Sequence, residues 1–233
     1  MLRTLLSGNF TMEEIFADIL AVLAIVFLIL PFHEWAHAQT AYLLGDKGIK
    51  ARGRLSLNPL SHIDPIGALM LLLVGFGWAK PVPVDPRHFK HPKFGMAITA
   101  LMGPVANALA ALIGLLAFNL VHYTVPDWLF SIEGLTITPT ILWYFLTFYI
   151  SVNIGLAVFN LIPFPPLDGS KVLFMFLPDK AVNFFYRYQL IFFGILFVLM
   201  WSGALDGVLT VCTHWMYDGL AWLAELPFLP FVK

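Results

Sequence analysis

The sequence predicts an all-α polytopic membrane protein with about five to six membrane helices and a short re-entrant or membrane-embedded extended segment between the first and second full spans. Of its 233 residues, 60% are hydrophobic and only 12% are charged, with a mean hydropathy of +0.84, whereas a soluble domain is about a quarter charged. Several apolar stretches also reach the roughly 20 residues needed to cross about 30 Å of hydrocarbon. No polar linker or repeat divides the chain, so we expect one domain over residues 1–233, with a core over about 12–175 and C-terminal helices over about 176–230.

The first helix is expected from about residue 12 to residue 44. Within it, residues 19–32 form an uncharged apolar run, and Gly45 followed by the charged stretch DKGIKARGR ends the helix. Pro31 lies inside this run and predicts an irregularity, because proline removes a backbone donor and crowds the preceding turn.

A short apolar piece, residues 66–79, follows between two loops rich in proline, glycine and basic residues. As a helix at about 1.5 Å per residue it would be about 21 Å long, less than the hydrocarbon thickness. We therefore expect it to dip into the membrane and return, or to lie within the protein. Alternating patterns in the flanking loops, RGRLSL and KPVPV, predict short extended segments.

Three longer apolar runs follow, over about 94–122, 138–162 and 181–201. Each is long enough to be read as a membrane helix. The tail from residue 206 onward is apolar but interrupted by acidic residues. We expect it either to span the membrane or to lie in the interface.

The motif HEWAH, residues 33–37, lies inside the apolar first helix. Residues four apart share a helix face, so His33 and His37 present two imidazoles to one point. Glu34 projects about 100° away, within reach of a metal-bound water, and H-E-x-x-H on a helix is the zinc-hydrolase arrangement. Ionisable groups at membrane depth each cost several kcal/mol, which metal coordination would offset. The alternative, a histidine pair hydrogen-bonded into the bundle, leaves Glu34 unexplained.

A catalytic zinc site normally has three protein ligands and one open position. The best third candidate is Asp168 in NLIPFPPLDG, because the prolines before it exclude a helix there, and non-helical backbone at membrane depth must be buried or line a watery cavity. The alternative is an Asp-Gly turn at the membrane surface. Cys212 is the only cysteine, which excludes thiolate clusters and intramolecular disulfides. Two histidines and one carboxylate suit zinc and could admit iron.

HEWAH and NLIPFPPLDG, joined by NPLSHIDPIG and GPVAN, together resemble the site-2 protease family of intramembrane zinc metalloproteases. The match is similar to the compact branch of that family, which lacks the PDZ domains found in some members, and it covers about residues 30–175 in the expected order. The resemblance implies an enzyme with one catalytic Zn²⁺ that hydrolyses peptide bonds within or near transmembrane segments of membrane proteins, through a zinc-activated water and a glutamate base.

Position by position, the resemblance implies that His33, His37 and Asp168 are zinc ligands and that Glu34 is the catalytic general base. Asn160 matches the family asparagine that holds the substrate backbone or the developing oxyanion. An interhelical hydrogen bond would also account for an asparagine at that position.

Other polar residues of these motifs are expected to act outside catalysis. Asn107 in GPVAN is expected to contribute helix packing or contacts to the metal ligands. His62 and Asp64 in SHIDP are ionisable and are expected near the site. They either contact the ligands or act as gate residues, or they serve only the structure of the loop. His88 and His91 are explained by a solvated basic loop.

Two other functional classes compete with a protease. A transporter or proton relay would scatter polar groups over several helices and often contain a repeat, whereas here they concentrate in two motifs. An inactive homologue that only binds membrane segments would have lost the base or a ligand, and none is missing. We expect transmembrane protein substrates and the lipid bilayer as partners and no nucleic acid, because the net charge is only −1. The sequence does not indicate an oligomeric state.

The charges predict the orientation of the chain. A shared metal requires the C-terminal ends of the first helix and of the 138–162 helix to lie on one side. The loops at that end carry most of the basic residues, namely Lys47, Lys50, Arg52, Arg54, Lys80, Arg87, Lys90 and Lys93. By the positive-inside rule this side is cytoplasmic. We therefore expect an integral, multi-pass protein of a prokaryotic cell membrane whose active site opens toward the cytoplasm.

Cysteine labelling tests this topology. In a Cys212→Ser background, single cysteines replacing Lys50 and His88 should react with an impermeant thiol reagent from the same side of the membrane. A cysteine replacing Phe130 should react from the other side. Opposite labelling of positions 50 and 88 would make 66–79 a true span and separate the catalytic ends.

Overall fold

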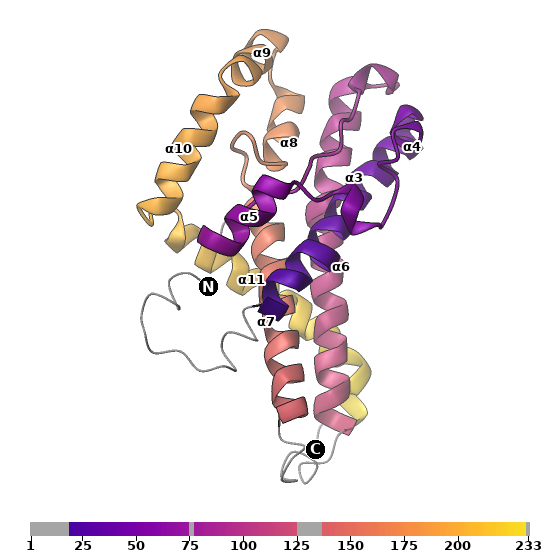
Figure 1. Cartoon of the computed structure of the whole chain (residues 1–233), viewed down its shortest axis with the longest axis vertical. Helices are drawn as coiled ribbons and strands as arrows, with labels where there is room; N and C mark the ends of the chain where they lie inside the picture. Colours follow the sequence, from indigo (N-terminus) through magenta and orange to yellow (C-terminus); the bar gives the residue numbers. More distant parts are fainter. Residues whose placement is uncertain (1–18, 75–76, 125–136, 232–233) are drawn as a thin grey trace.

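A computed structural model describes residues 19–74, 77–124 and 137–231 (Figure 1). All named secondary-structure elements in this part of the chain are helices. In chain order they are η1 (Ile25–Ile29), α3 (Leu30–Leu44), α4 (Gly48–Ala51), η2 (Pro59–Ser61), α5 (Pro65–Val74), η3 (Pro86–His88), α6 (Pro92–Thr124), α7 (Ile137–Leu161), α8 (Gly169–Phe176), α9 (Asp179–Arg187), α10 (Gln189–Trp201), α11 (Asp206–Glu225) and η5 (Leu226–Phe231). The predicted all-α class is confirmed.

Three helices are long and apolar enough to cross a membrane, over Ile19–Leu44, Pro92–Thr124 and Ile141–Leu161. α9 and α10 give a fourth candidate only if this pair, bent by 70°, counts as one span. In the described residues the expected five to six membrane helices are therefore too many. The expectation failed at the C-terminus: the run 181–201 is divided between α9 and α10 by the 70° bend, and α11 is not among the helices that are long and apolar enough to cross.

The first span is irregular just before the HEWAH motif. Residues Ile25–Ile29 form a π-helical turn, and Pro31 follows in the first turn of α3. A π-turn widens the helix where the regular hydrogen-bond ladder is disturbed, and proline disturbs it by lacking an N–H. The irregularity expected at Pro31 thus lies in the turn preceding it, and α3 carries the motif as a regular helix.

The chain on either side of α5 closes on itself. Ile63 and Ala79 form an isolated antiparallel bridge, and the N–H of Lys80 donates to the carbonyl of His62 at 2.8 Å. α5 itself has only 10 residues, about 15 Å at 1.5 Å per residue. The segment therefore starts and finishes at one place and does not cross the bundle, as the length of 66–79 indicated.

The two extended segments expected in the flanking loops do not form a strand in the described residues; the Ile63–Ala79 bridge is the pairing found there. The second segment, KPVPV, does not form a strand because of its prolines. Pro81 and Pro83 have no N–H, so a regular ladder cannot continue through them.

α6 is the central helix, and it packs against α3, α7, α8 and α11. Figure 1 shows α6 and α7 running side by side along the long axis of the molecule. The buried face of α6 consists largely of small residues, Gly95, Ala97, Ala100, Gly103, Ala106, Ala110, Ala111 and Gly114. Small residues let membrane helices approach closely, and van der Waals packing then stabilises the pair.

Gly114 on α6 faces α7. A Cβ atom there would sit 2.9 Å from Cγ1 of Ile150 and 3.1 Å from Cδ1 of Tyr149. We expect Gly114→Val to lower the free energy of unfolding by about 1–3 kcal/mol, the usual cost of overpacking. Thermal unfolding in detergent measures this. Gly155→Val on α7 is the control, because a Cβ at Gly155 meets nothing within 4 Å; equal melting temperatures for both variants would contradict the prediction.

Candidate metal centre

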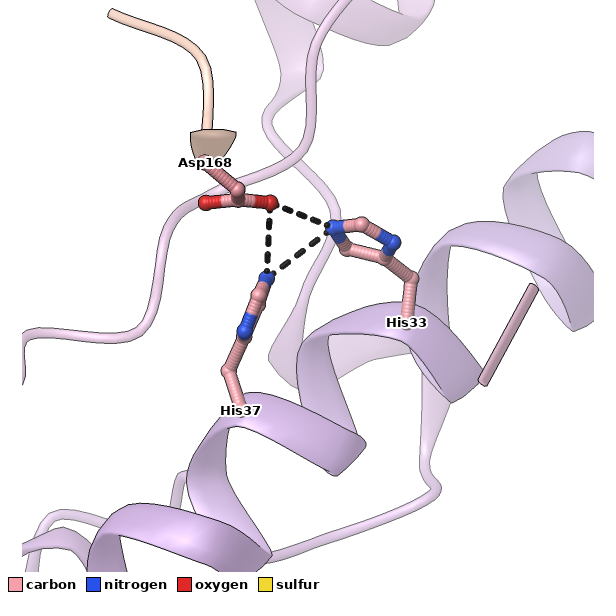
Figure 2. Close-up of side chains that lie close together, drawn as sticks. All are labelled: His33, His37 and Asp168. Atoms are coloured by element: carbon pink, nitrogen blue, oxygen red, sulfur yellow. Dashed lines mark hydrogen bonds and ion pairs between the residues drawn. The ribbon is translucent and has the colours of Figure 1, made fainter. Parts of the chain in front are cut away.

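His33, His37 and Asp168 form a triangle of facing side chains (Figure 2). The Nε2 atoms of the two histidines lie 3.0 Å apart. Oδ2 of Asp168 lies 3.3 Å from His33 Nε2 and 3.2 Å from His37 Nε2. Both histidines are buried and Asp168 is half-buried. Residues separated by more than 130 positions in the chain, by sequence numbering, thus converge on one point.

The triangle fits a zinc ion. A tetrahedral zinc with nitrogen and oxygen ligands at about 2.0–2.1 Å keeps neighbouring ligand atoms about 3.3 Å apart, close to the three distances found here. Gly103 on α6 leaves the necessary room, because a Cβ there would lie 2.4 Å from His37 Nε2 and 2.5 Å from His33 Cε1. Two imidazoles and one carboxylate are also a ligand set that zinc hydrolases use.

The far ring nitrogens of both histidines are held by polar groups on α6. Nδ1 of His37 lies 2.7 Å from the carbonyl oxygen of Thr99, and Nδ1 of His33 lies 2.5 Å from Oδ1 of Asn107. Both partners are acceptors, so each histidine carries a proton on Nδ1, and Nε2 is the ring nitrogen that faces the triangle and is available to a metal. Such partners fix the tautomer and the orientation of metal-ligating histidines.

The loop after α7 presents Asp168 to the histidines. Asp168 is the N-cap residue of α8, but its side chain makes no capping hydrogen bond and is free to point at the imidazoles. Gly169 allows the loop to pass close to the end of α7, because a Cβ there would lie 2.2 Å from the carbonyl oxygen of Leu161. Nζ of Lys171 donates to the carbonyls of Pro166 at 2.7 Å and Leu167 at 3.3 Å.

Charge around the loop favours an ionised carboxylate. Burial alone would raise the pKa of Asp168, but the charges and hydrogen bonds of His37 and His33 hold that pKa well below its usual range. Burial lowers the pKa of Lys171, and the carboxylates of Asp168 and Glu34 oppose this shift. Asp168 is therefore an ionised carboxylate at the start of α8, as a carboxylate that binds a metal must be.

Glu34 follows His33 in the sequence, and its carboxylate has a partner outside the triangle. Its Oε2 accepts a hydrogen bond of 3.1 Å from the N–H of Val82. Because Pro81 and Pro83 lack an N–H, Val82 carries the one donor of this tripeptide. Arg54 holds the same segment in place by donating to the carbonyls of Lys80 and Pro81, the latter at 3.0 Å.

The other residues expected near the site take structural contacts. Nδ2 of Asn160 donates to the carbonyl of Leu156 at 3.0 Å, within α7. Nε2 of His62 bonds the carbonyl of Ser56 at 2.7 Å. Oδ1 of Asp64 accepts from the N–H groups of Ile66 and Gly67 and so caps α5. Of this group of motif residues, Asn107 is the one in direct contact with a histidine of the triangle.

His88 is more than part of a solvated loop. Its Nδ1 lies 3.2 Å from Oδ1 of Asp46, a fully buried carboxylate. Asp46 also accepts from Nη2 of Arg52 at 3.1 Å and from the N–H of Asp85 at 2.9 Å. This network ties the end of α3 to the loop before α6. His91 is exposed, as expected for a basic loop.

Sequence reasoning missed several residues that shape the site. Gly103 stands in the same GPVAN stretch as Asn107. A glycine inside an apolar helix was the sequence signal that could have indicated a close contact there. Asn153 is a polar residue in an apolar helix, which is itself unusual, and it bonds Asn107. The contributions of Thr99 and Val82 come from the backbone, so their side chains give no signal.

The relatives found by comparison with known proteins are named as zinc metalloproteases, and three of them are described here. The chain is 41% identical over 151 residues to "Putative zinc metalloprotease YwhC" of Bacillus subtilis, an alignment that covers 64% of this chain and 66% of the relative. It is 27% identical over 191 residues to "Putative zinc metalloprotease Rip2" of Mycolicibacterium smegmatis and 26% identical over 196 residues to Rip2 of Mycobacterium tuberculosis H37Rv, each covering 80% of this chain and 68% of the relative.

The chain thus spans about two thirds of the length of these relatives, and slightly less than that for YwhC. No family model and no solved structure matches the chain. The names of the homologues support a zinc metalloprotease family for this chain, in agreement with the ligand triangle.

Gly103 offers a test of the metal centre. We expect Gly103→Ala to lower zinc affinity by at least about tenfold, the lower end of the effect of disturbing the groups around metal ligands, because the added methyl group collides with both imidazoles. Zinc bound per protein after dialysis against a chelator measures this. Gly155→Ala is the control. Full zinc occupancy in Gly103→Ala would show that the metal does not sit between these rings.

Proposed function

We propose that this chain is an intramembrane zinc metalloprotease of the site-2 protease type, which hydrolyses peptide bonds within or near transmembrane segments of membrane proteins. One observation carries the proposal. His33 and His37, which face Asp168, lie on a helix that is itself long and apolar enough to cross a membrane. A soluble zinc hydrolase has no need to place its ligands there. The names of the homologues support the zinc and protease parts of the proposal.

His33, His37 and Asp168 would hold the zinc ion. When bound there, zinc supplies a Lewis acid for the scissile carbonyl and acidifies a water molecule toward a pKa of about 7. The two imidazoles donate neutral nitrogen lone pairs and Asp168 donates a carboxylate oxygen, so the ligands leave one positive charge uncompensated for the reaction.

Glu34 is the proton carrier in this proposal. Its carboxylate accepts the proton of the attacking water and then delivers it to the leaving amine, the role of a general base and acid. The N–H of Val82 holds the Oε2 atom, which leaves Oε1 for the water.

Asn160 is proposed to hold the substrate backbone or the oxyanion. It lies in the last turn of α7, eight positions before Asp168 by sequence numbering. Its Nδ2 donates to Leu156 in this structure, so it must exchange that bond for the substrate. The exchange is possible because the helical N–H of Asn160 can still serve the same carbonyl.

The substrate helix must unwind before hydrolysis, because its peptide bonds are protected by its own hydrogen-bond ladder. Pairing the unwound stretch as an added strand would satisfy its backbone. Segment 80–84 is a poor partner, since its prolines lack N–H groups and Val82 is engaged by Glu34. We therefore propose residues 55–57, which lie in the non-helical loop between α4 and η2 and whose Leu55 packs against the same hydrophobic cluster as Val82.

The site is proposed to open toward the cytoplasm. α3 ends at Leu44, seven residues beyond His37 by sequence numbering, and the basic loops follow directly. By the positive-inside rule this end faces the cytoplasm. Transmembrane proteins and the bilayer are the proposed partners.

Substitution of the site residues tests the proposal. Glu34→Gln should retain zinc but reduce cleavage of tagged single-pass membrane proteins by about 10²–10⁴-fold, because a general base is lost while the ligands remain. His33→Ala and Asp168→Ala should lose zinc as well as activity. Metal analysis and product detection on the same purified variants measure both.

The pattern of losses is decisive. Full zinc and full cleavage in Asp168→Ala would show that the third ligand is misassigned. Cleavage by Glu34→Gln at the wild-type rate would rule out Glu34 as the base. Stoichiometric zinc in the wild type without cleavage of any transmembrane substrate would contradict the proteolytic function while leaving the metal centre intact.

A further inference from the structure

A chain of buried amides connects His33 to the backbone of α7. Nδ2 of Asn107 on α6 donates to Oδ1 of Asn153 on α7 at 2.9 Å, and Nδ2 of Asn153 donates to the carbonyl of Tyr149 at 2.8 Å. At the other end, Oδ1 of Asn107 faces Nδ1 of His33. Asn107 and Asn153 are each 1% exposed.

The direction of every hydrogen bond in this chain follows from its last member. A backbone carbonyl only accepts, so Asn153 must turn its NH₂ group to Tyr149 and its oxygen to Asn107. Asn107 must then turn its NH₂ group to Asn153 and its oxygen to His33. An acceptor at Nδ1 leaves His33 with its proton there and with the lone pair on Nε2.

The two histidines of the triangle therefore reach the same tautomer by different routes. His37 meets a backbone carbonyl, that of Thr99, directly. His33 meets the carbonyl of Tyr149 only through two intervening amides. Without Asn153, the amide of Asn107 could rotate by 180° and place its NH₂ group against His33, which would favour the opposite tautomer and turn an N–H toward the metal position.

Burial makes any other arrangement of these hydrogen-bonded amides costly. An unpaired polar group in an apolar interior costs the full desolvation of that group, so the amides remain in the one arrangement that pairs all their atoms. An asparagine at position 153 of an apolar membrane helix is itself unfavourable. Simple packing between α6 and α7 would be served by an alanine or leucine at this position, as at its neighbours Ile150, Ile154 and Ala157.

We propose that Asn153 is a positioning residue of the metal centre, which sets the tautomer of His33 through Asn107. The proposal rests on the zinc site of the proposed function. Asn153 touches neither the metal position nor a substrate, and its effect on the reaction passes entirely through the orientation of one imidazole nitrogen.

Nitrogen NMR of the metal-free, full-length protein with labelled histidine tests the first half of the proposal. His33 in the wild type should show the tautomer protonated on Nδ1. Asn153→Leu should reduce the population of this tautomer, and Asn153→Asp, which keeps an acceptor oxygen toward Asn107, should restore it. An Nε2-protonated His33 in the wild type, or an unchanged tautomer in Asn153→Leu, would overturn the proposal.

Zinc affinity, measured by competition with a chelator, tests the second half. Asn153→Leu should weaken binding by about 10–100-fold, as for other residues that orient metal ligands, and Asn107→Leu should weaken it at least as much. The double variant should be no weaker than Asn107→Leu alone. Additive losses would show that Asn153 does not act through Asn107.

Asn119→Leu is the matched control. Its Nδ2 donates to the carbonyl of Ala224 at 3.1 Å. The change to leucine therefore also removes a hydrogen bond of an asparagine side chain on α6, but one far from His33 in the chain. If it weakened zinc binding as much as Asn153→Leu, the effect would be general destabilisation and the proposal would fail. Because both measurements use metal and tautomer rather than cleavage, a proteolytic function that failed would not affect their outcome.

Discussion

The enclosure of three candidate metal ligands, His33, His37 and Asp168, inside an apolar bundle is the constraint on which the rest of this structure depends. Two imidazoles and a carboxylate have no place at membrane depth unless a partner compensates each of them. α6 provides most of that compensation: Gly103 gives space for the rings, the carbonyl of Thr99 holds His37, and Asn107 holds His33. The row of small residues on α6 lets α3 come close enough for these contacts. The packing of the helices and the chemistry of the site thus have one cause.

Glu34 is positioned by a second set of contacts, made by the loops at the end of α3. Arg54 fixes the backbone of segment 80–84 against Glu34. The buried carboxylate of Asp46 then joins the end of α3 to the loop before α6 through Arg52 and the N–H of Asp85. Glu34 and the ligand triangle are therefore positioned by different parts of the chain. The three candidate ligands depend on helix packing, and Glu34 depends on a loop that is fixed by hydrogen bonds from Arg54 to backbone carbonyls.

Local patterns carried most of what could be predicted. The spacing of His33 and His37 follows from helix geometry alone, and composition sufficed to indicate membrane helices. Asp168 stood out because prolines interrupt an apolar run before it. The contacts that complete the site join residues 46, 48 and 74 positions apart, and they depend on helix registers that no local pattern specifies. The number of spans was overestimated for a related reason: no local pattern indicated that the apolar run 181–201 is broken by a 70° bend between α9 and α10.

The contact between Glu34 and Val82 is made by the main chain, and this has a consequence for how the site can vary. Any amino acid except proline supplies the same N–H, so the contact with Glu34 places no demand on the side chain at position 82. That side chain packs instead against the cluster of Ala38, Ala41, Ile49 and Phe89. The identity of residue 82 is therefore set by hydrophobic packing, while its service to the carboxylate of Glu34 is performed by the main chain alone.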